Sequence, residues 1–334
     1  MSYKNIWESI IRPPREQYSI NALGPKRFTI RKRLYKRKDF TLTNSRCLTL
    51  MCSHFEPVTK ERVCKELPCV IYLHCNAGSR LESLSLLRSL LPANITVFTF
   101  DFSGCGISEG EYISLGWNEQ EDLRTVVNYL RETEKVSFIG LWGRSMGAVT
   151  ALLYGETDPS IAAIVADSPF CSLKTVIKEQ AKKYSKMPGF IISVAKNIIK
   201  KTILKKSGFD IDVLNPIDHV SQCYIPILFC HGVNDNFIYP KHTERLFDSY
   251  AGEKDRILIE GDHNSIRPKY FLDSVSIFFY NALQCDLLPE PKIRDKKKKK
   301  AEKLPKEISL KASVKFQKQL DREEKRLKSI NANN

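Results

Sequence analysis

The sequence has no long hydrophobic run and no recognisable targeting segment at either end. No stretch of about 18 apolar residues occurs, so we predict no membrane-spanning helix. The N-terminal residues MSYKNIWESI lack a basic segment followed by an apolar one, which argues against a secretory signal. Neither a myristoylation glycine after Met1 nor a C-terminal prenylation motif is present. We therefore expect a cytoplasmic protein.

Cysteine pairs with the spacing of metal or redox motifs are also missing. The chain has ten cysteines, but none belongs to a C-x-x-C pair, and several lie inside apolar runs such as 227–230. A buried, reduced thiol behaves as a small hydrophobic group, and proteins of reducing compartments keep their thiols free. We therefore expect neither disulfides nor a metal site, and the sequence indicates no cofactor.

Basic charge is scarce in the middle of the chain and abundant at its ends. The formal net charge is +15, yet residues 41–290 carry a net charge of −3. Residues 1–40 carry +8 and residues 291–334 carry +10. Because the central region is slightly acidic, it does not have the composition of a nucleic-acid-binding domain, and we do not expect nucleic acid as a partner.

Short apolar runs alternate with helical patterns through most of the chain. Two opening antiparallel strands are predicted at 27–35 and 40–55, with Asn44-Ser45 as the turn. Later apolar runs predict strands buried on both faces, at 70–73, 95–100, 136–141, 161–166, 225–230 and 256–259. Helices are predicted between and after them, at 83–91, 118–132, 146–154, 241–250 and 268–283. This order predicts an α/β fold: a mostly parallel open sheet with antiparallel N-terminal strands and helices on both faces.

Residues 171–214 interrupt this alternation. They contain two amphipathic helical patterns, at 173–184 and 190–204, with ten lysines against three acidic residues. We interpret this segment as a small helical cap inserted after the strand at 161–166. The chain then divides into an N-terminal extension (1–26), a main domain with its cap (27–288) and a basic tail (289–334). The tail has a run of five lysines and a weakly amphipathic helical pattern at 309–330.

The segment Gly143-Arg144-Ser145-Met146-Gly147 matches the G-x-S-x-G pattern of a nucleophile turn. It lies where a strand is predicted to end and a helix to begin, which puts Ser145 on a sharp turn at a helix N-terminus. Small residues at 143 and 147 allow neighbouring segments to approach closely, and a helix N-terminus favours a developing anion. Ser145 is therefore the candidate nucleophile.

A serine nucleophile needs a base, and His263 is the preferred candidate among six histidines. His74 and His231 also stand at strand ends and are alternatives by position alone. Chain order favours His263, because nucleophile, acid and histidine follow one another in that order in open α/β sheets that carry G-x-S-x-G. The acid is then Asp235, which follows the strand at 225–230, with Asp167 as the alternative. Its role is to orient the imidazole.

The negatively charged oxygen of an acyl-transfer intermediate needs two N–H donors. Met146, directly after the nucleophile, offers one backbone N–H. The second donor is expected in the loop after the 70–73 strand, where the backbone N–H of Asn76 is preferred and that of Ala77 is the alternative.

Together these motifs resemble the α/β-hydrolase superfamily. Within it, the chain looks most like the serine aminopeptidase-like and BEM46-like branch, with which it shares HxNAGSR, DFSGxGxSEG (101–110) and LWGRSMGA. The segment IIRPPREQY (10–18) is similar to an N-terminal feature of some members, and the resemblance covers about residues 10–284. It implies hydrolysis of an ester, thioester or amide without a cofactor, through the triad Ser145, Asp235 and His263.

One position departs from this family pattern. Where the family has His-Gly-Asn, the chain has His74-Cys75-Asn76. Glycine permits backbone conformations that a Cβ atom resists, so Cys75 is expected to reshape the oxyanion loop and lower the rate.

Three functions are compatible with these residues. The first is an enzyme that cleaves an acyl ester or thioester through an acyl-enzyme at Ser145, with the cap shaping the acyl pocket. The second is a serine aminopeptidase-like peptide hydrolase, although the lysine-rich cap disfavours substrates with a cationic end. The third is a weakly active or inactive hydrolase fold kept as a binding protein, which the complete triad argues against.

The basic ends also offer a surface for acidic partners. The triplets 31–33 and 36–38 flank an N-terminal strand, and anionic membranes attract such segments. The apolar residues of 190–204 predict either a helix on a membrane surface or an ordinary lid over the active site, and the lid is preferred. Peripheral association with an anionic membrane is therefore an added expectation for this cytoplasmic protein.

Overall fold

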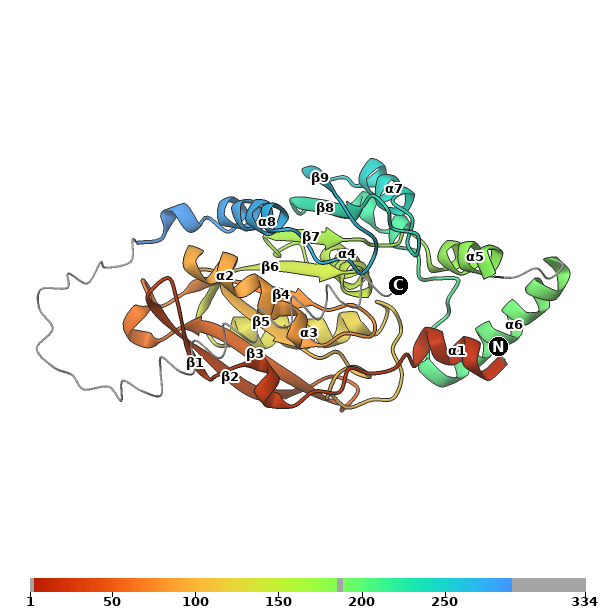
Figure 1. Ribbon diagram of the computed structural model, residues 1–334, viewed down its shortest axis with the longest axis horizontal. Coiled ribbons are helices and arrows are strands. Elements are labelled where there is room, and N and C mark those ends of the chain that lie inside the picture. Colours follow the sequence, from red (N-terminus) through yellow and green to blue (C-terminus); the bar gives the residue numbers. More distant parts are fainter. Residues whose placement is uncertain (1–2, 185–188, 290–334) are drawn as a thin grey trace, which may run out of the picture.

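The computed structural model describes residues 3–184 and 189–289 (Figure 1). In these residues nine strands form one mixed sheet in the order β1-β2-β3-β5-β4-β6-β7-β8-β9. The antiparallel part contains β1 (Arg27–Ile30), β2 (Arg33–Thr43) and β3 (Thr49–Pro57), and β3 also runs antiparallel to β5. The parallel part contains β4 (Leu67–Leu73), β5 (Thr96–Phe100), β6 (Val136–Arg144), β7 (Ala163–Asp167), β8 (Ile227–Gly232) and β9 (Lys254–Ile259). The predicted α/β fold is confirmed.

Helices cover both faces of the sheet. Successive residues of a strand point to opposite sides, and in the central strands the side chains on both sides are apolar and buried. On β4, Ile71 belongs to the core cluster under α3 and α4, whereas Val70 and Tyr72 belong to the cluster under α2 and α8. α3 spans Glu119–Glu132, α4 Met146–Thr157, α7 Lys241–Ser249, α2 Leu87–Leu90 and α8 Lys269–Ala282. Every residue of β4 and of β7 is buried, which explains their continuous apolar runs.

Four predicted elements differ in detail. The predicted strand 27–35 is a tight hairpin, because Arg31 and Lys32 take positive φ angles of 47° and 67° that end β1 and start β2. The predicted helix 83–91 is mostly a 3-10 helix over Arg80–Leu86, followed by the single turn of α2. β6 and β8 extend past their predicted ends and thereby reach the residues of the candidate site.

Two helices follow β7, as predicted: α5 (Leu173–Tyr184) and α6 (Gly189–Ser207). A third helix that we did not predict, α1 (Tyr3–Ile11), lies beside α6 (Figure 1). The Lys206 ammonium of α6 stands 4.8 Å from the ring centroid of Trp7, which is buried on α1. The N-terminal segment therefore packs against the cap instead of extending away from the fold.

The predicted tail helix at 309–330 and the lysine run lie outside the described residues. Within the described ranges, no helix combines the length and apolar character needed to cross a bilayer.

Candidate active site

Ser145 sits between β6 and α4 on a strained turn. Its φ is 52° and its ψ −113°, a conformation that side chains other than glycine rarely adopt. Its backbone N–H donates to the Asp167 carbonyl at 2.7 Å. The two flanking glycines are required by close approach: a Cβ atom on Gly143 would lie 2.1 Å from the Gly147 carbonyl oxygen, and one on Gly147 would lie 2.0 Å from that of Leu73. These contacts explain the G-x-S-x-G spacing.

The structure brings the three predicted triad residues into one hydrogen-bonded row. His263 Nε2 lies 3.0 Å from Ser145 Oγ, and His263 Nδ1 lies 2.6 Å from Asp235 Oδ2. All three are buried or nearly so, at 7%, 8% and 2% exposure for Ser145, His263 and Asp235. This geometry permits His263 Nε2 to take the serine proton while the Nδ1–H group keeps its hydrogen bond to the Asp235 carboxylate.

Asp235 is held as a carboxylate by its surroundings. Its Oδ1 accepts the backbone N–H groups of Phe237 at 3.0 Å and Ile238 at 2.8 Å. Burial opposes ionisation, but hydrogen bonds from His231 and His263 hold the pKa of Asp235 well below its usual range. The group beside His263 is therefore negatively charged at neutral pH.

The two alternative histidines have other partners. His231 is buried, with Nδ1 2.7 Å from Thr243 Oγ1. Its Nε2 lies 2.7 Å from the Ile238 carbonyl oxygen and 3.1 Å from Asp235 Oδ2, the same carboxylate oxygen that His263 contacts. His74 is also buried, and its Nε2 accepts the Phe102 N–H at 3.1 Å. Among the described residues, neither ring forms a hydrogen bond with Ser145.

Asp167, the alternative acid, is bound to an arginine and not to His263. The Arg267 guanidinium makes a two-bond pair with it, Nη2–Oδ1 at 2.6 Å and Nε–Oδ2 at 2.7 Å. Burial would raise the pKa of this carboxyl, but Arg267 outweighs burial and lowers it to about 2. Asp167 therefore anchors Arg267, and its backbone oxygen anchors Ser145.

Two arginines that our sequence reasoning passed over hold the loop that carries His263. Arg144 Nη2 donates to the carbonyl oxygens of His263 at 2.8 Å and Ser265 at 3.2 Å. Arg267 Nη1 donates to the same Ser265 oxygen at 3.0 Å. Arg144 occupies the variable second position of the serine motif, so only its position beside the nucleophile hinted at a role.

The predicted oxyanion donors come from two different elements. Met146 is the first residue of α4, directly after Ser145. Asn76 lies on the loop after β4, half-buried, and its carbonyl oxygen is 3.7 Å from the Cys105 thiol. In the part of the chain that the structure describes, the Asn76 N–H donates to no backbone carbonyl, and Asn76 stays the predicted second donor.

The Cys75 backbone does not adopt the positive φ that favours glycine, so this position does not need glycine. Its Sγ lies 3.1 Å from Glu82 Oε1, and its N–H points to Glu82 Oε2 at 3.4 Å. Burial and the Glu82 carboxylate raise the pKa of the Cys75 thiol. The side chain that replaces the family's glycine therefore contacts the Glu82 carboxylate.

The other family-like motifs brace this loop. Asp101, at the end of β5, accepts the Arg80 N–H at 2.8 Å, the Ile107 N–H at 3.0 Å and the Tyr18 hydroxyl at 2.5 Å. Gly106 has a φ of 47°, and a Cβ atom there would lie 2.4 Å from the Asp101 carboxylate. HxNAGSR, DFSGxGxSEG and the N-terminal segment therefore meet at one buried carboxylate.

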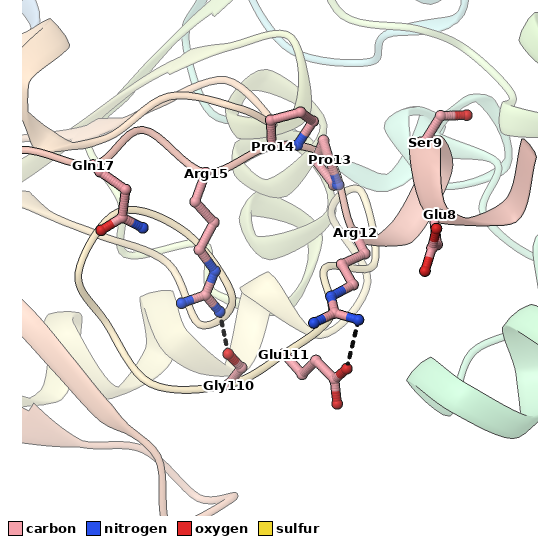
Figure 2. Close-up of a pocket in the computed structure, with 9 residues that line it drawn as sticks. All are labelled: Glu8, Ser9, Arg12, Pro13, Pro14, Arg15, Gln17, Gly110 and Glu111. Atoms are coloured by element: carbon pink, nitrogen blue, oxygen red, sulfur yellow. Dashed lines mark hydrogen bonds and ion pairs between the residues drawn. The ribbon is translucent and has the colours of Figure 1, made fainter. Parts of the chain in front are cut away.

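A pocket of about 810 Å³ lies beside the N-terminal segment (Figure 2). Arg12 pairs there with Glu111 at 3.0 Å, and Arg15 donates to the Gly110 carbonyl. None of the triad residues lines this pocket. It is therefore separate from the candidate active site.

Most of the basic residues at 31–38 are bound within the fold. Arg37, 5% exposed, pairs with Asp39 at 2.8 Å, and Arg33 donates to Asn94 Oδ1 at 2.6 Å. Lys36 and Lys38 both pair with Glu56. These pairs reduce the positive charge that this strand offers to an acidic surface.

The ten cysteines are free thiols in the structure. In the described part of the chain, no group of three His, Cys, Asp or Glu side chains is arranged to hold a metal ion.

Comparison with known proteins agrees with this architecture. Residues 68–206 match the family model described as the alpha/beta hydrolase fold. The structure of the esterase Pf2001 from Pyrococcus furiosus matches with a TM-score of 0.58, covering 75% of this chain and 92% of that one at 22% identity. The chain has the α/β-hydrolase fold.

Proteins with similar sequences include members of the predicted BEM46-like branch. The uncharacterized protein YqkD of Bacillus subtilis is 30% identical over 199 residues, which are 58% of this chain and 64% of YqkD. The lysophosphatidylserine lipase ABHD12 of Danio rerio is 27% identical over 56% of this chain and 48% of its own length. Protein bem46 of Schizosaccharomyces pombe is 26% identical over 54% and 55%. The resemblance to the BEM46-like branch is confirmed, and the chain spans less than two thirds of each of these relatives.

Proposed function

We propose that this chain is a serine hydrolase that cleaves a carboxylic ester or thioester through an acyl-enzyme at Ser145. The observation that carries the proposal is the row of hydrogen bonds from Ser145 Oγ through His263 to Asp235, at 3.0 and 2.6 Å. The names of ABHD12, a lipase, and Pf2001, an esterase, are consistent with ester chemistry.

In the first half of the reaction, Ser145 Oγ attacks the substrate carbonyl carbon while His263 Nε2 takes its proton. The negative charge moves to the carbonyl oxygen, where the N–H groups of Met146 and Asn76 stabilise it. The tetrahedral intermediate then breaks its bond to the leaving group. His263 gives that group the proton, and an acyl-enzyme remains on Ser145.

In the second half, water attacks the acyl-enzyme and His263 takes a proton from the water. The second tetrahedral intermediate breaks its bond to Ser145 Oγ and releases the acid, while His263 Nε2 returns the proton to Ser145 Oγ. Asp235 remains ionised throughout, because its lowered pKa keeps it a carboxylate while it stabilises the imidazolium.

The test is labelling of the full chain with a fluorophosphonate probe, followed by hydrolysis of p-nitrophenyl acyl esters. We expect the wild type to be labelled and active, and Ser145→Ala to lose both. The matched control is Ser137→Ala, which removes an exposed serine from the opposite end of β6. Equal labelling of wild type and Ser145→Ala, or no labelling of the wild type, contradicts the proposal and leaves the fold as a binding protein.

A peptide-hydrolysing activity would use the same three residues. The hydrolysis assay distinguishes it from ester hydrolysis when both substrate classes are offered. Aminoacyl p-nitroanilides, offered in parallel with acyl esters, place a cationic α-amino group beside the scissile bond. We expect the acyl esters to be turned over faster. A preference for the aminoacyl amides would replace the ester proposal with the peptidase alternative.

A further inference from the structure

One exposed aromatic side chain lies directly beside the candidate base. The ring centroid of Phe237 is 5.2 Å from that of His263, and the two planes meet at 61°, an edge-on contact. Phe237 is nevertheless 44% exposed. Two other apolar residues of the same loop, Val233 and Tyr239, are 39% and 36% exposed. The loop that follows β8 thus exposes three apolar side chains, one of which packs against the His263 ring.

The position of Phe237 is set by its backbone. Its N–H donates to Asp235 Oδ1 at 3.0 Å, and its carbonyl oxygen accepts Gln180 Nε2 of α5 at 2.6 Å. The first bond ties the residue to the acid, and the second ties it to the cap. The ring itself makes neither bond, so removing the ring leaves both anchors in place.

The order of bond changes determines which part of a substrate meets this ring. The acyl carbon is bonded to Ser145 Oγ, and the carbonyl oxygen is directed to the N–H groups of Met146 and Asn76. The leaving group must instead approach His263 Nε2, because it receives its proton there. The leaving group is therefore the part of the substrate that approaches the His263 ring, against which Phe237 packs.

We propose, on the basis of the function proposed above, that Phe237 binds an apolar alcohol or thiol leaving group and selects for it. When an alkyl or aryl leaving group packs against the exposed Phe237 ring, apolar surface of both the leaving group and the ring is removed from water. Because this contact exists only until the leaving group departs, it acts on acylation and not on deacylation.

The experiment uses two series of esters with the full-length protein. In one, the acyl group is acetyl and the leaving alcohol runs from ethanol to hexanol and benzyl alcohol. In the other, the leaving group is p-nitrophenol and the acyl chain runs from acetyl to octanoyl. The variants are Phe237→Ala, Phe237→Leu and, as a matched loss of an exposed aromatic ring elsewhere, Tyr224→Ala, which is 73% exposed in the wild type.

We expect Phe237→Ala to lower kcat/KM for hexyl and benzyl acetate about tenfold while changing ethyl acetate little, a difference typical of a few methylene contacts. Phe237→Leu should retain part of the preference, and the acyl series should keep its slope in all variants. The deacylation rate, measured from the steady phase after a p-nitrophenol burst, should be unchanged.

Three results overturn this assignment while the proposed function stands. They are an unchanged leaving-group series in Phe237→Ala, a change confined to the acyl series, and an equal loss on all substrates that includes deacylation. The last result would mean that the ring only shields the His263–Asp235 pair. A wild type that hydrolyses no ester and binds no probe contradicts the proposed function itself, and the assignment with it.

Discussion

Two loops follow strands that lie on opposite sides of β6 in the sheet, and charged side chains bind different backbone groups in each. The base loop, residues 262–267, carries His263 and is held through its carbonyl oxygens by Arg144 and Arg267. The oxyanion loop, residues 74–80, is held largely through its N–H groups, by Glu82 at Cys75 and by Asp101 at Arg80. Arginines bind carbonyl oxygens of the base loop, although its Asn264 and Ser265 N–H groups also donate to the Asp262 carboxylate. The oxyanion loop is bound by carboxylates at its N–H groups.

This difference matches what each loop has to present. The base loop must fix a ring whose nitrogens face Ser145 and Asp235, so its spare backbone oxygens are tied away from the site. The oxyanion loop must keep one N–H free for a substrate oxygen, and its neighbouring N–H groups are bound elsewhere. Both loops are therefore braced through backbone groups that the proposed reaction does not use.

The largest effect is expected at the buried ion pair that braces the base loop. Arg267→Met leaves Asp167 buried without its partner, since Asp167 is 1% exposed and Arg267 8%. Removal of one partner of a buried pair costs about 3–5 kcal/mol, and urea unfolding measures this loss of stability. The double variant Asp167→Leu/Arg267→Met should recover much of it. A single variant as stable as the wild type would show that the pair does not brace the loop.

Acid should weaken the same brace. The pKa of Asp167 is lowered from 3.8 to about 2, so the unfolded chain binds a proton in a range where the folded chain does not. The pair's contribution, about 2 kcal/mol for this shift, is present above pH 3.8 and is lost as the pH falls towards 2. Urea unfolding at several pH values should show this fall, and it should be shallower in Asp167→Leu/Arg267→Met. Parallel profiles would contradict the assignment.

A smaller effect, on catalysis, is expected from the other arginine of the base loop. Arg144→Gln removes the bonds to the His263 and Ser265 carbonyls, and each hydrogen bond to a charged group is worth about 1.5–3 kcal/mol when buried. Arg144 is only half-buried, so we expect kcat/KM to fall about tenfold with little change in stability. Arg144→Lys should restore part of the rate, because an ammonium can still donate to one carbonyl.

The smallest effect is expected in the oxyanion loop, at Cys75→Gly. The Cys75 backbone does not have a positive φ, so glycine relieves no strain and the hydrolysis rate should stay within about twofold. Stability should fall by roughly 0.5–1 kcal/mol, because glycine has more freedom in the unfolded chain. A large gain in rate would restore the sequence-based expectation that this position limits the enzyme.

The fold and the central residues of the site could be predicted because they depend on short-range patterns. Apolar runs alternating with helical periods determine a parallel sheet, and the strand ends then determine where Ser145, Asp235 and His263 gather. The predicted strand boundaries were less accurate at 27–35. A hairpin turn occurs there at two residues with positive φ, and neither of them is the glycine that usually indicates such a turn. The helix at 3–11 was missed because its apolar face is completed by α6, a segment distant in the chain.

The sequence by itself determined the nucleophile turn, the chain order of the triad and the architecture that carries them. Only the tertiary structure showed which groups Arg144, Arg267, Glu82 and Phe237 contact. These are contacts between loops that follow different strands, and no local period or motif encodes such contacts. The same reason applies to the basic residues near β2, of which Lys36, Arg37 and Lys38 pair with Glu56 and Asp39 in the fold.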